Sequence, residues 1–310
     1  MTKWTTRTLL SISLGIVGHA NAGLIGLDLI DNTDNGSQKI IGALLNADSG
    51  INVVAGSEVF FGQRGAASAP GDSQSGIFSG VNISNGTTSV KLGQGAILTT
   101  GTANVPDSNT SAFFGQSVFS GPDADLEAIL IDAGAPNSNT DDVNFISFDF
   151  TLAAGLNAVA FDFIFGSDEF PDQSVTDVFG FFIDGINYAF FPDNSLVSFV
   201  QGANETNFIS NIDRDFNIEY DGFSKVLNVV GKVNSNLSTH TLKIAIADTS
   251  DTVYDSAVML SNLTGLFTTG GGGVGDPPSL VSAPTNMAFF ALALFGIGFR
   301  QRLKTKILSR

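Results

Sequence analysis

Cysteine is absent from the 310 residues, and there are only two histidines. Without cysteine, disulfide bonds, thiolate catalysis and cysteine-ligated zinc or iron sites are excluded within the chain. His19 lies in an N-terminal segment that we expect to be removed, so His240 is the single imidazole expected in the mature protein. A histidine cluster that binds a metal within one chain is therefore excluded. Core packing or a bound cation must stabilise the fold.

Basic residues are also scarce in the central part of the chain. Residues 23–299 contain 7 basic and 30 acidic side chains, a net charge of -23. Because nucleic acids and anionic lipids attract Lys and Arg, we expect no nucleic-acid partner. An acidic surface suits divalent cations, basic partners or simple solubility in a salty exterior.

Phenylalanine and glycine are abundant, at 27 and 35 residues, whereas charged residues make up 14% of the chain. The hydrophobic content of 43% is sufficient for a large buried core. This mixture favours short strands joined by glycine-containing turns. We therefore predict an all-β fold with one or two short helices, a β-sandwich of a jelly-roll-like type.

Strand patterns run through most of the chain. In residues 145–152 apolar side chains alternate with polar ones, as in a strand with one face in the core. Gly155 and the Asp184-Gly185 pair mark expected hairpin turns. The core-facing side chains would be Ile146, Phe148, Phe150 and Leu152. Other strands are expected at residues 51–54, 58–61, 76–83, 95–99, 157–165, 178–183, 186–190, 225–233, 240–248 and 256–262.

Two short segments have helical spacing instead. Residues 37–46 carry apolar side chains at intervals of three and four, with Ser37 as the expected N-cap. Residues 124–131 have a similar pattern, with Asp123 as the expected N-cap. Both helices are expected to pack on a sheet.

The N-terminus has the order of a secretory signal peptide. Lys3 and Arg7 precede an apolar run at residues 9–18, which is followed by small residues that include Ala20 and Ala22. The apolar run is about half of the roughly 20 residues that a membrane-spanning helix needs. We expect signal peptidase to cleave after Ala22, so that residues 1–22 are removed.

The C-terminus changes composition after the expected globular domain, residues 23–267. Residues 268–280 have the glycine and proline content of a linker. The last segment, residues 281–310, contains an apolar stretch at 287–299 and five basic residues after it. The apolar stretch is short for a stable membrane span, but a basic cluster of this kind holds a tail in the inner membrane with its basic end in the cytoplasm. Transient anchoring in the inner membrane is therefore expected, and a permanent single-pass anchor is the alternative.

This C-terminal arrangement resembles the PEP-CTERM sorting signal, a short motif ending in proline followed by an apolar segment and a basic end. Val281 and Pro284 match the family's Val-Pro-Glu-Pro motif, whereas Ser282 and Ala283 differ from it. The resemblance implies processing by an exosortase-type sorting enzyme.

The expected globular domain resembles the choice-of-anchor L domain, a family found on exported bacterial proteins with different anchoring tails. The resemblance implies a β-rich module displayed at the cell surface or released outside the cell, and it implies no catalytic residues. It covers roughly residues 40–265. The matching stretches are GAILTTG at 95–101, DADLEAI at 123–129, FDFIFGSDEFPD at 161–172, DVFGFFIDG at 177–185, YDGFSKVL at 220–227 and LKIAIADTSDTVYDSAVML at 242–260.

Two acidic stretches are candidate ligands for calcium, which binds carboxylate and carbonyl oxygens. Their spacing differs from an EF-hand loop, and turn amides could instead be the partners of these carboxylates. If the strands bring the two stretches together, one site could be shared. The first stretch contributes Asp168, Glu169, Asp172 and Asp177, and the second contributes Asp248, Asp251 and Asp255.

No catalytic residues are assigned. Asp168 and Glu169 would point to opposite sides of an extended segment, although Glu169 could pair with Asp177 or Asp255. His240 is interpreted as a solvated side chain at a strand edge rather than as a base. A sugar-binding platform of exposed aromatic rings is an alternative to core packing for Tyr188, Tyr220 and Tyr254.

Together these patterns predict an exported, surface-anchored bacterial protein that is not an enzyme. Its role would be adhesion, envelope structure or biofilm matrix, and an extracellular polysaccharide is a candidate partner. The alternatives are a calcium-dependent carbohydrate-binding module and a secreted hydrolase. Polysaccharide binding that chelator abolishes would indicate the first alternative, and substrate turnover would indicate the second.

Overall fold

The computed structural model describes residues 23–173, 177–249 and 251–275. The expected signal peptide with Ala20 and Ala22, the motif at Val281 and Pro284, and the apolar segment lie outside these residues. The described part consists of antiparallel β-sheets with two short α-helices, which confirms the predicted fold class.

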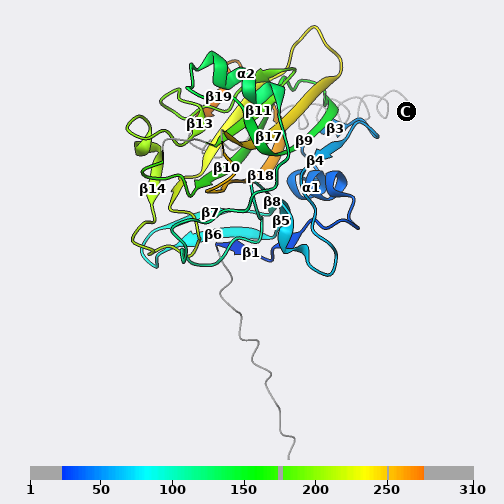
Figure 1. The fold of residues 1–310 in the computed structure, drawn as a ribbon. Helices are drawn as coiled ribbons and strands as arrows, with labels where there is room; N and C mark the ends of the chain where they lie inside the picture. The colour runs from blue at the N-terminus through cyan, green and yellow to red at the C-terminus, as the bar shows by residue number, and fades with distance from the viewer. Residues whose placement is uncertain (1–22, 174–176, 250, 276–310) are drawn as a thin grey trace, which may run out of the picture.

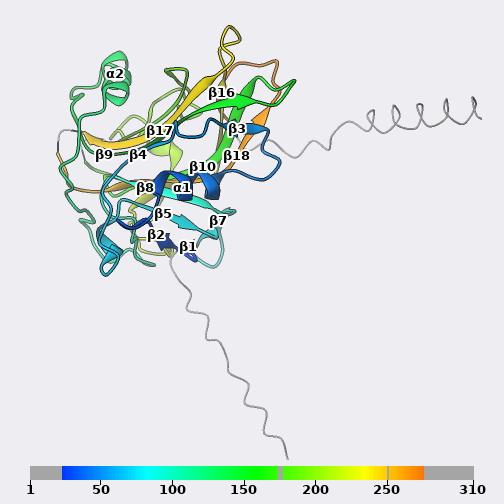
Figure 2. The ribbon, with the colours of Figure 1, turned by 90° about the vertical axis from the view of Figure 1, so that its right-hand side faces the viewer.

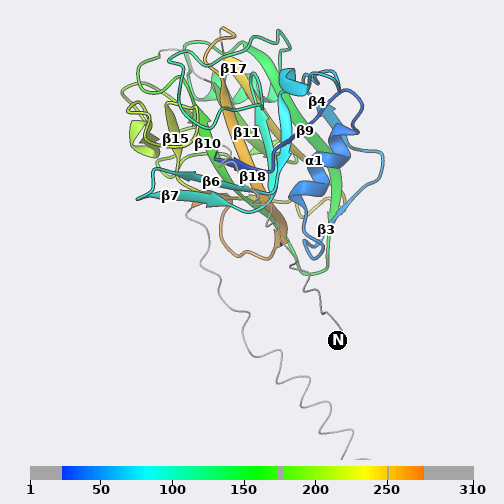
Figure 3. The same ribbon diagram turned by 90° about the horizontal axis from the view of Figure 1, so that it is seen from below.

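Three sheets lie in layers, with β1 near one pole of the molecule and α2 (Ala124–Asp132) near the other (Figure 1 and Figure 2). The smallest sheet contains β1 (Leu24–Ile25), β6 (Gly80–Ser84) and β7 (Ser89–Leu92). It lies in front of β10 (Ala158–Ser167) and β18 (Ser256–Leu266) when the molecule is seen from below (Figure 3).

The nine-stranded sheet forms one half of the sandwich. Its central strands are β10 (Ala158–Ser167) and β18 (Ser256–Leu266), which pair with each other over almost their whole length. The other strands are β2 (Asp28–Leu29), β5 (Ser75–Phe78), β8 (Gly95–Thr99), β14 (Phe208–Ser210), β15 (Gly222–Ser224), β16 (Leu227–Lys232) and β19 (Gly273–Gly275).

The seven-stranded sheet forms the other half. Its central strand is β17 (His240–Thr249), with β9 (Thr140–Leu152) on one side and β11 (Val178–Ile183) on the other. The remaining strands are β3 (Ile51–Val53), β4 (Val59–Phe61), β12 (Ile186–Asn187) and β13 (Val197–Ser198).

Phenylalanine side chains fill the space between the two large sheets. Phe148 and Phe150 of β9 meet Phe161 and Phe163 of β10 and Phe181 of β11 in one buried cluster. The rings of Phe161 and Phe181 meet edge to face with centroids 4.7 Å apart, a favourable arrangement of aromatic quadrupoles. The alternation predicted for residues 145–152 is confirmed, because Ile146, Phe148 and Phe150 are buried.

The outer faces of both large sheets are covered as well. Ile164 and Met259 point away from the phenylalanine core and pack beneath β1 and β6, in a second buried cluster. Strands β10 and β18 are therefore buried on both faces, which explains their nearly continuous apolar sequences. On the opposite side, Leu126 and Leu130 of α2 cover the outer face of the seven-stranded sheet.

Both predicted helices are present. Helix α1 (Gly36–Leu44) is capped by Asn35 rather than by Ser37, because the Asn35 side chain accepts from the amide of Gln38. Helix α2 (Ala124–Asp132) is capped by Asp123, as predicted. Two 3-10 turns complete the helical elements, η1 (Pro70–Asp72) and η2 (Glu205–Asn207).

Three details differ from the sequence expectations. The strand expected at 76–83 is divided into β5 and β6, which belong to different sheets. Gly155, with φ +87°, lies in a turn that links β9 to β10 and so joins two sheets instead of forming a hairpin. Asp184-Gly185 does form the hairpin between β11 and β12. Residues 273–275, within the expected linker, pair with β16.

Candidate functional site: a buried acidic cluster

Two connections between the large sheets lie side by side at one end of the sandwich. The first leads from β10 to β11 and includes residues 168–173 and 177, and the second leads from β17 back to β18 and includes residues 251–255. Ser167 is paired with Ser256 in the nine-stranded sheet, and Val178 is paired with Ala247 in the other sheet. Both crossings must therefore occur at the same end, which brings the two acidic stretches together.

Five carboxyl groups at this end of the sandwich, four from the connections and one from the end of β17, form a buried cluster. A backbone hydrogen bond joins the connections directly, since the amide of Asp168 donates to the carbonyl of Asp255 at 3.1 Å. No side chain of the cluster is more than 2% exposed. Asp172 is exposed and Asp251 is partly exposed, so neither belongs to the buried set. The cluster consists of Asp168, Glu169, Asp177, Asp248 and Asp255.

Asp255 holds a long irregular loop, residues 100–123, against the end of the sandwich. Its carboxylate accepts hydrogen bonds from the amides of Thr102 at 3.2 Å and Gln116 at 3.0 Å. A Cβ atom at Gly101 would overlap this carboxylate, so the backbone comes closer to it than any other residue type permits. The position of the loop is therefore fixed by a buried carboxyl group.

Three further buried carboxylates bind the same loop. A loop of this length without regular structure has many backbone amides to satisfy, and charged acceptors form the stronger hydrogen bonds. Phe114 donates to Asp168 at 2.7 Å, Val118 donates to Asp142 at 2.9 Å, Phe119 also donates to Asp142, and Thr110 and Ser111 donate to Glu219 at 3.0 and 2.6 Å. We call Asp142, Asp168, Glu219 and Asp255 the loop-binding carboxylates.

Sequence reasoning missed Asp142 and Glu219. Neither belongs to an acidic stretch with a recognisable spacing. The available signal was indirect, because a segment of about twenty irregular residues must find acceptors for its amides.

The other three members of the cluster have no such partners. Both carboxylate oxygens of Glu169, Asp177 and Asp248 are buried without a hydrogen bond among the described residues. The ion pairs between described residues do not reach these groups either. We call Glu169, Asp177 and Asp248 the unpartnered carboxylates. In their present orientations, no three acidic or histidine side chains of the described residues are arranged to hold a metal ion.

Burial raises the pKa of every carboxyl group in the cluster, because it penalises the charged form. It raises the pKa of Asp168 and of Asp255 to about 7. Burial, followed by the charge of Asp177, raises the pKa of Glu169 to about 10. Burial also raises the pKa values of Asp177 and Asp248 well above the usual range.

Two groups beside Asp177 oppose the rise in its pKa, although burial outweighs them. The Ser256 hydroxyl and the Asp248 carboxyl lie close enough to lower the pKa of Asp177. Neither is placed well enough to count as a hydrogen-bond partner of its carboxylate.

The single histidine of the expected mature chain lies in a different environment from the one predicted. His240 is only 6% exposed, and its Nδ1 is 2.9 Å from Oδ2 of Asp184. The prediction of a solvated strand-edge side chain is therefore wrong, because the β11–β12 turn covers the ring. Tyr220 is also fully buried, so it cannot contribute to an exposed aromatic platform.

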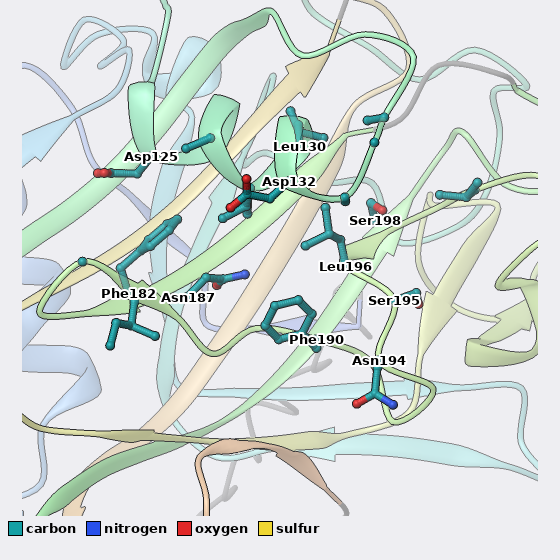
Figure 4. Close-up of a pocket in the computed structure, with 18 of the residues that line it drawn as sticks. Asp125, Leu130, Asp132, Phe182, Asn187, Phe190, Asn194, Ser195, Leu196 and Ser198 are labelled. Carbon is teal, nitrogen blue, oxygen red and sulfur yellow. The ribbon is translucent and has the colours of Figure 1, made fainter.

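A groove of about 850 Å³ lies apart from the acidic cluster, between α2 and the segment that runs from β11 to β13. Figure 4 shows Phe182, Asn187, Phe190 and Leu196 around it. None of the five cluster carboxylates lines this groove. This groove and the acidic cluster are thus separate features.

Comparison with known families agrees with the sequence resemblance. The profile of the choice-of-anchor L domain matches residues 30–264, and the chain belongs to this family. Membership of this family indicates an exported or cell-surface protein. Searches of curated proteins and of solved structures found no significant match. Within the part of the chain that the structure describes, no helix has the length and apolar character needed to span a membrane.

Proposed function

We propose that this chain is an exported bacterial surface protein with a non-catalytic role in adhesion, envelope structure or biofilm matrix. The signal-peptide pattern, the linker composition and the tail at residues 281–310 support export, transient inner-membrane anchoring and exosortase-type processing. The family match over residues 30–264 supports surface display.

The burial of the acidic cluster is the observation that carries the non-catalytic role. Hydrolysis by two carboxyl groups requires them to face each other across a cleft that admits the substrate. Here Glu169 and Asp177 are each 1% exposed, and the loop at residues 100–123 is bound against the cluster. The carboxylates therefore make their contacts inside the protein and are not accessible to a substrate. This arrangement favours a structural or adhesive module over a hydrolase.

Export and processing can be tested with the full chain in a bacterium that has a sorting enzyme of this class. Wild-type protein is expected in the surface or extracellular fraction, with a mass that lacks residues 1–22 and the end of the tail. The Pro284→Ala variant is expected to remain unprocessed in the inner membrane. Pro277→Ala, in the linker, is the matched control and should be processed normally. Cytoplasmic accumulation of the wild-type chain would contradict the proposal.

The composition of the groove favours a second function, binding of an extracellular polysaccharide. Its wall combines the partly exposed aromatic ring of Phe190 with the amides of Asn187 and Asn194 and the hydroxyl of Ser195. Aromatic faces pack on apolar faces of sugar rings, and side-chain amides bond to hydroxyl groups.

Co-sedimentation of the full chain with insoluble polysaccharides tests this second function. Phe190→Ala should reduce the bound fraction at least tenfold. Phe113→Ala removes an exposed ring outside the groove and should leave binding unchanged. Equal loss of binding in both variants would show that the groove is not the site.

A further inference from the structure

Three carboxylates share one unusual property, which is independent of the surface role proposed above. The six side-chain oxygens of Glu169, Asp177 and Asp248 are all buried, and none has a hydrogen-bond partner among the described residues. Buried carboxylates in folded proteins are normally paired, hydrogen-bonded or bound to a metal. A set of three without any of these partners calls for a ligand.

Two of the three groups lie in the connection from β10 to β11, the third lies at the end of β17, and all three are at the same end of the sandwich. Glu169 follows β10, and Asp177 directly precedes β11. Asp248 lies at the end of β17, and the pairing of Val178 with Ala247 places it beside Asp177. One ligand could therefore join the residue that follows β10 to the adjoining ends of β11 and β17, and so link the two large sheets.

The groups around the unpartnered carboxylates indicate which chemical class of ligand would bind there. The backbone amides of Thr102, Phe114 and Gln116 donate hydrogen bonds to Asp168 and Asp255, so they do not donate to the unpartnered carboxylates. The ion pairs of the described residues involve other acidic side chains. One oxygen of Asp168 and the Tyr220 hydroxyl are also buried without a partner, which adds further oxygen donors and no positive charge.

We propose that Glu169, Asp177 and Asp248 bind a hard divalent cation of the size of calcium, with the free oxygen of Asp168 as a further ligand. A donor set made of carboxylate oxygens selects calcium, magnesium or manganese over softer metals. Calcium fits best, because it accepts six to eight oxygens in irregular geometry, whereas magnesium requires a near-octahedral shell and retains several waters. Asp172 and Asp251 are outside this set, because they are exposed or partly exposed.

Binding requires the carboxylates to turn, since their present orientations do not form a metal site. Rotation about the side-chain torsions gives up only weak approaches, those of Ser256 and Asp248 to Asp177 and of Thr100 to Asp248, because none of the six oxygens makes a well-formed hydrogen bond among the described residues. By contrast, if Asp255 turned to bind the cation, it would lose its hydrogen bonds from the amides of Thr102 and Gln116. It therefore positions the loop and is not a ligand.

Thermal unfolding of the full chain in mild detergent tests the proposal. Saturating calcium should raise the melting temperature by about 5–10 °C over the value in excess chelator, by preferential binding to the native state. Asp177→Asn and Asp248→Asn should abolish this rise. Both should unfold in chelator at or above the wild-type temperature, because each replaces a buried carboxyl group whose ionisation the fold penalises. Asp172→Asn, in the same connection, is the matched control and should keep the full rise.

Terbium luminescence provides a second measurement that does not depend on the stability of a variant. Terbium bound beside Tyr220 should emit on excitation of tyrosine, and calcium should displace it. Emission should fall at least tenfold in Glu169→Gln and remain in Asp172→Asn. The absence of both a melting shift and sensitised emission for the wild-type chain at millimolar metal would overturn the proposal. A response of equal size in Asp177→Asn would overturn the assigned ligands.

Discussion

Gly101→Ala is expected to release the long loop from the acidic cluster. A Cβ atom at this position would lie far inside the 3.0 Å limit that real Cβ contacts observe, against the carboxylate of Asp255. That carboxylate is completely buried and cannot move into solvent. The substitution must therefore displace the loop backbone.

The expected cost follows from the hydrogen bonds that the displacement breaks. Asp255 accepts two amide hydrogen bonds, at 3.2 and 3.0 Å, and hydrogen bonds to charged groups contribute about 1.5–3 kcal/mol each. Partial relaxation of the loop reduces the loss, so we expect about 3–4 kcal/mol. For a domain of this size, this corresponds to a fall in melting temperature of about 10 °C.

Thermal unfolding by circular dichroism measures this effect. Gly42→Ala is the matched control, because Gly42 lies in α1 with open space around its Cβ position. The control should stabilise the protein by up to about 1 kcal/mol, since alanine is the better helix former. A melting temperature for Gly101→Ala within about 2 °C of wild type would refute the role assigned to Asp255.

Three other predictions concern pH and packing. In excess chelator, the free energy of unfolding should fall between about pH 4 and pH 8, because the native pKa of Asp255 is raised from 3.8 to about 7. The stability that Asp255 contributes is fully present below its unfolded-state pKa and is lost as the pH rises through 7, a loss of up to about 4 kcal/mol. Urea titrations at several pH values measure this loss, and a free energy of unfolding that rises with pH would contradict the prediction. Phe208→Ala should cost about 3 kcal/mol in urea unfolding, since its ring contacts four other phenylalanines, whereas Phe119→Ala, at an exposed position, should cost almost nothing. Asp184→Asn should lower stability by about 1–2 kcal/mol and increase hydrogen exchange at the amide of residue 241, because it weakens the contacts of the β11–β12 turn with His240; unchanged exchange would contradict this.

Local sequence pattern was sufficient for most of the secondary structure. The alternation in residues 145–152 identified both the strand and its core face, because period-two patterning follows directly from strand geometry. Asp123 identified the start of α2 for a similarly local reason, since its carboxylate accepts the amides of the first helical turn. The family was also recognisable from short stretches of sequence, and the match over residues 30–264 confirms it.

Elements without a local pattern could not be found in this way. Strands β13, β14 and β15 contain only two or three residues, and their pairing depends on neighbours that are distant in the chain. His240 was placed incorrectly for the same reason, because the turn that covers it begins 56 residues earlier.

The sequence by itself determined the all-β class, the core faces of the central strands and the identity of the acidic residues. Only the tertiary structure decided what those acidic residues do. The pairing of β10 with β18 and of β11 with β17 places both sheet crossings at one end, and this long-range register brings the carboxylates together. Their separation into loop-binding and unpartnered groups depends on where the amides of residues 100–123 come to lie. That position is set by contacts across more than one hundred residues, which no local pattern encodes.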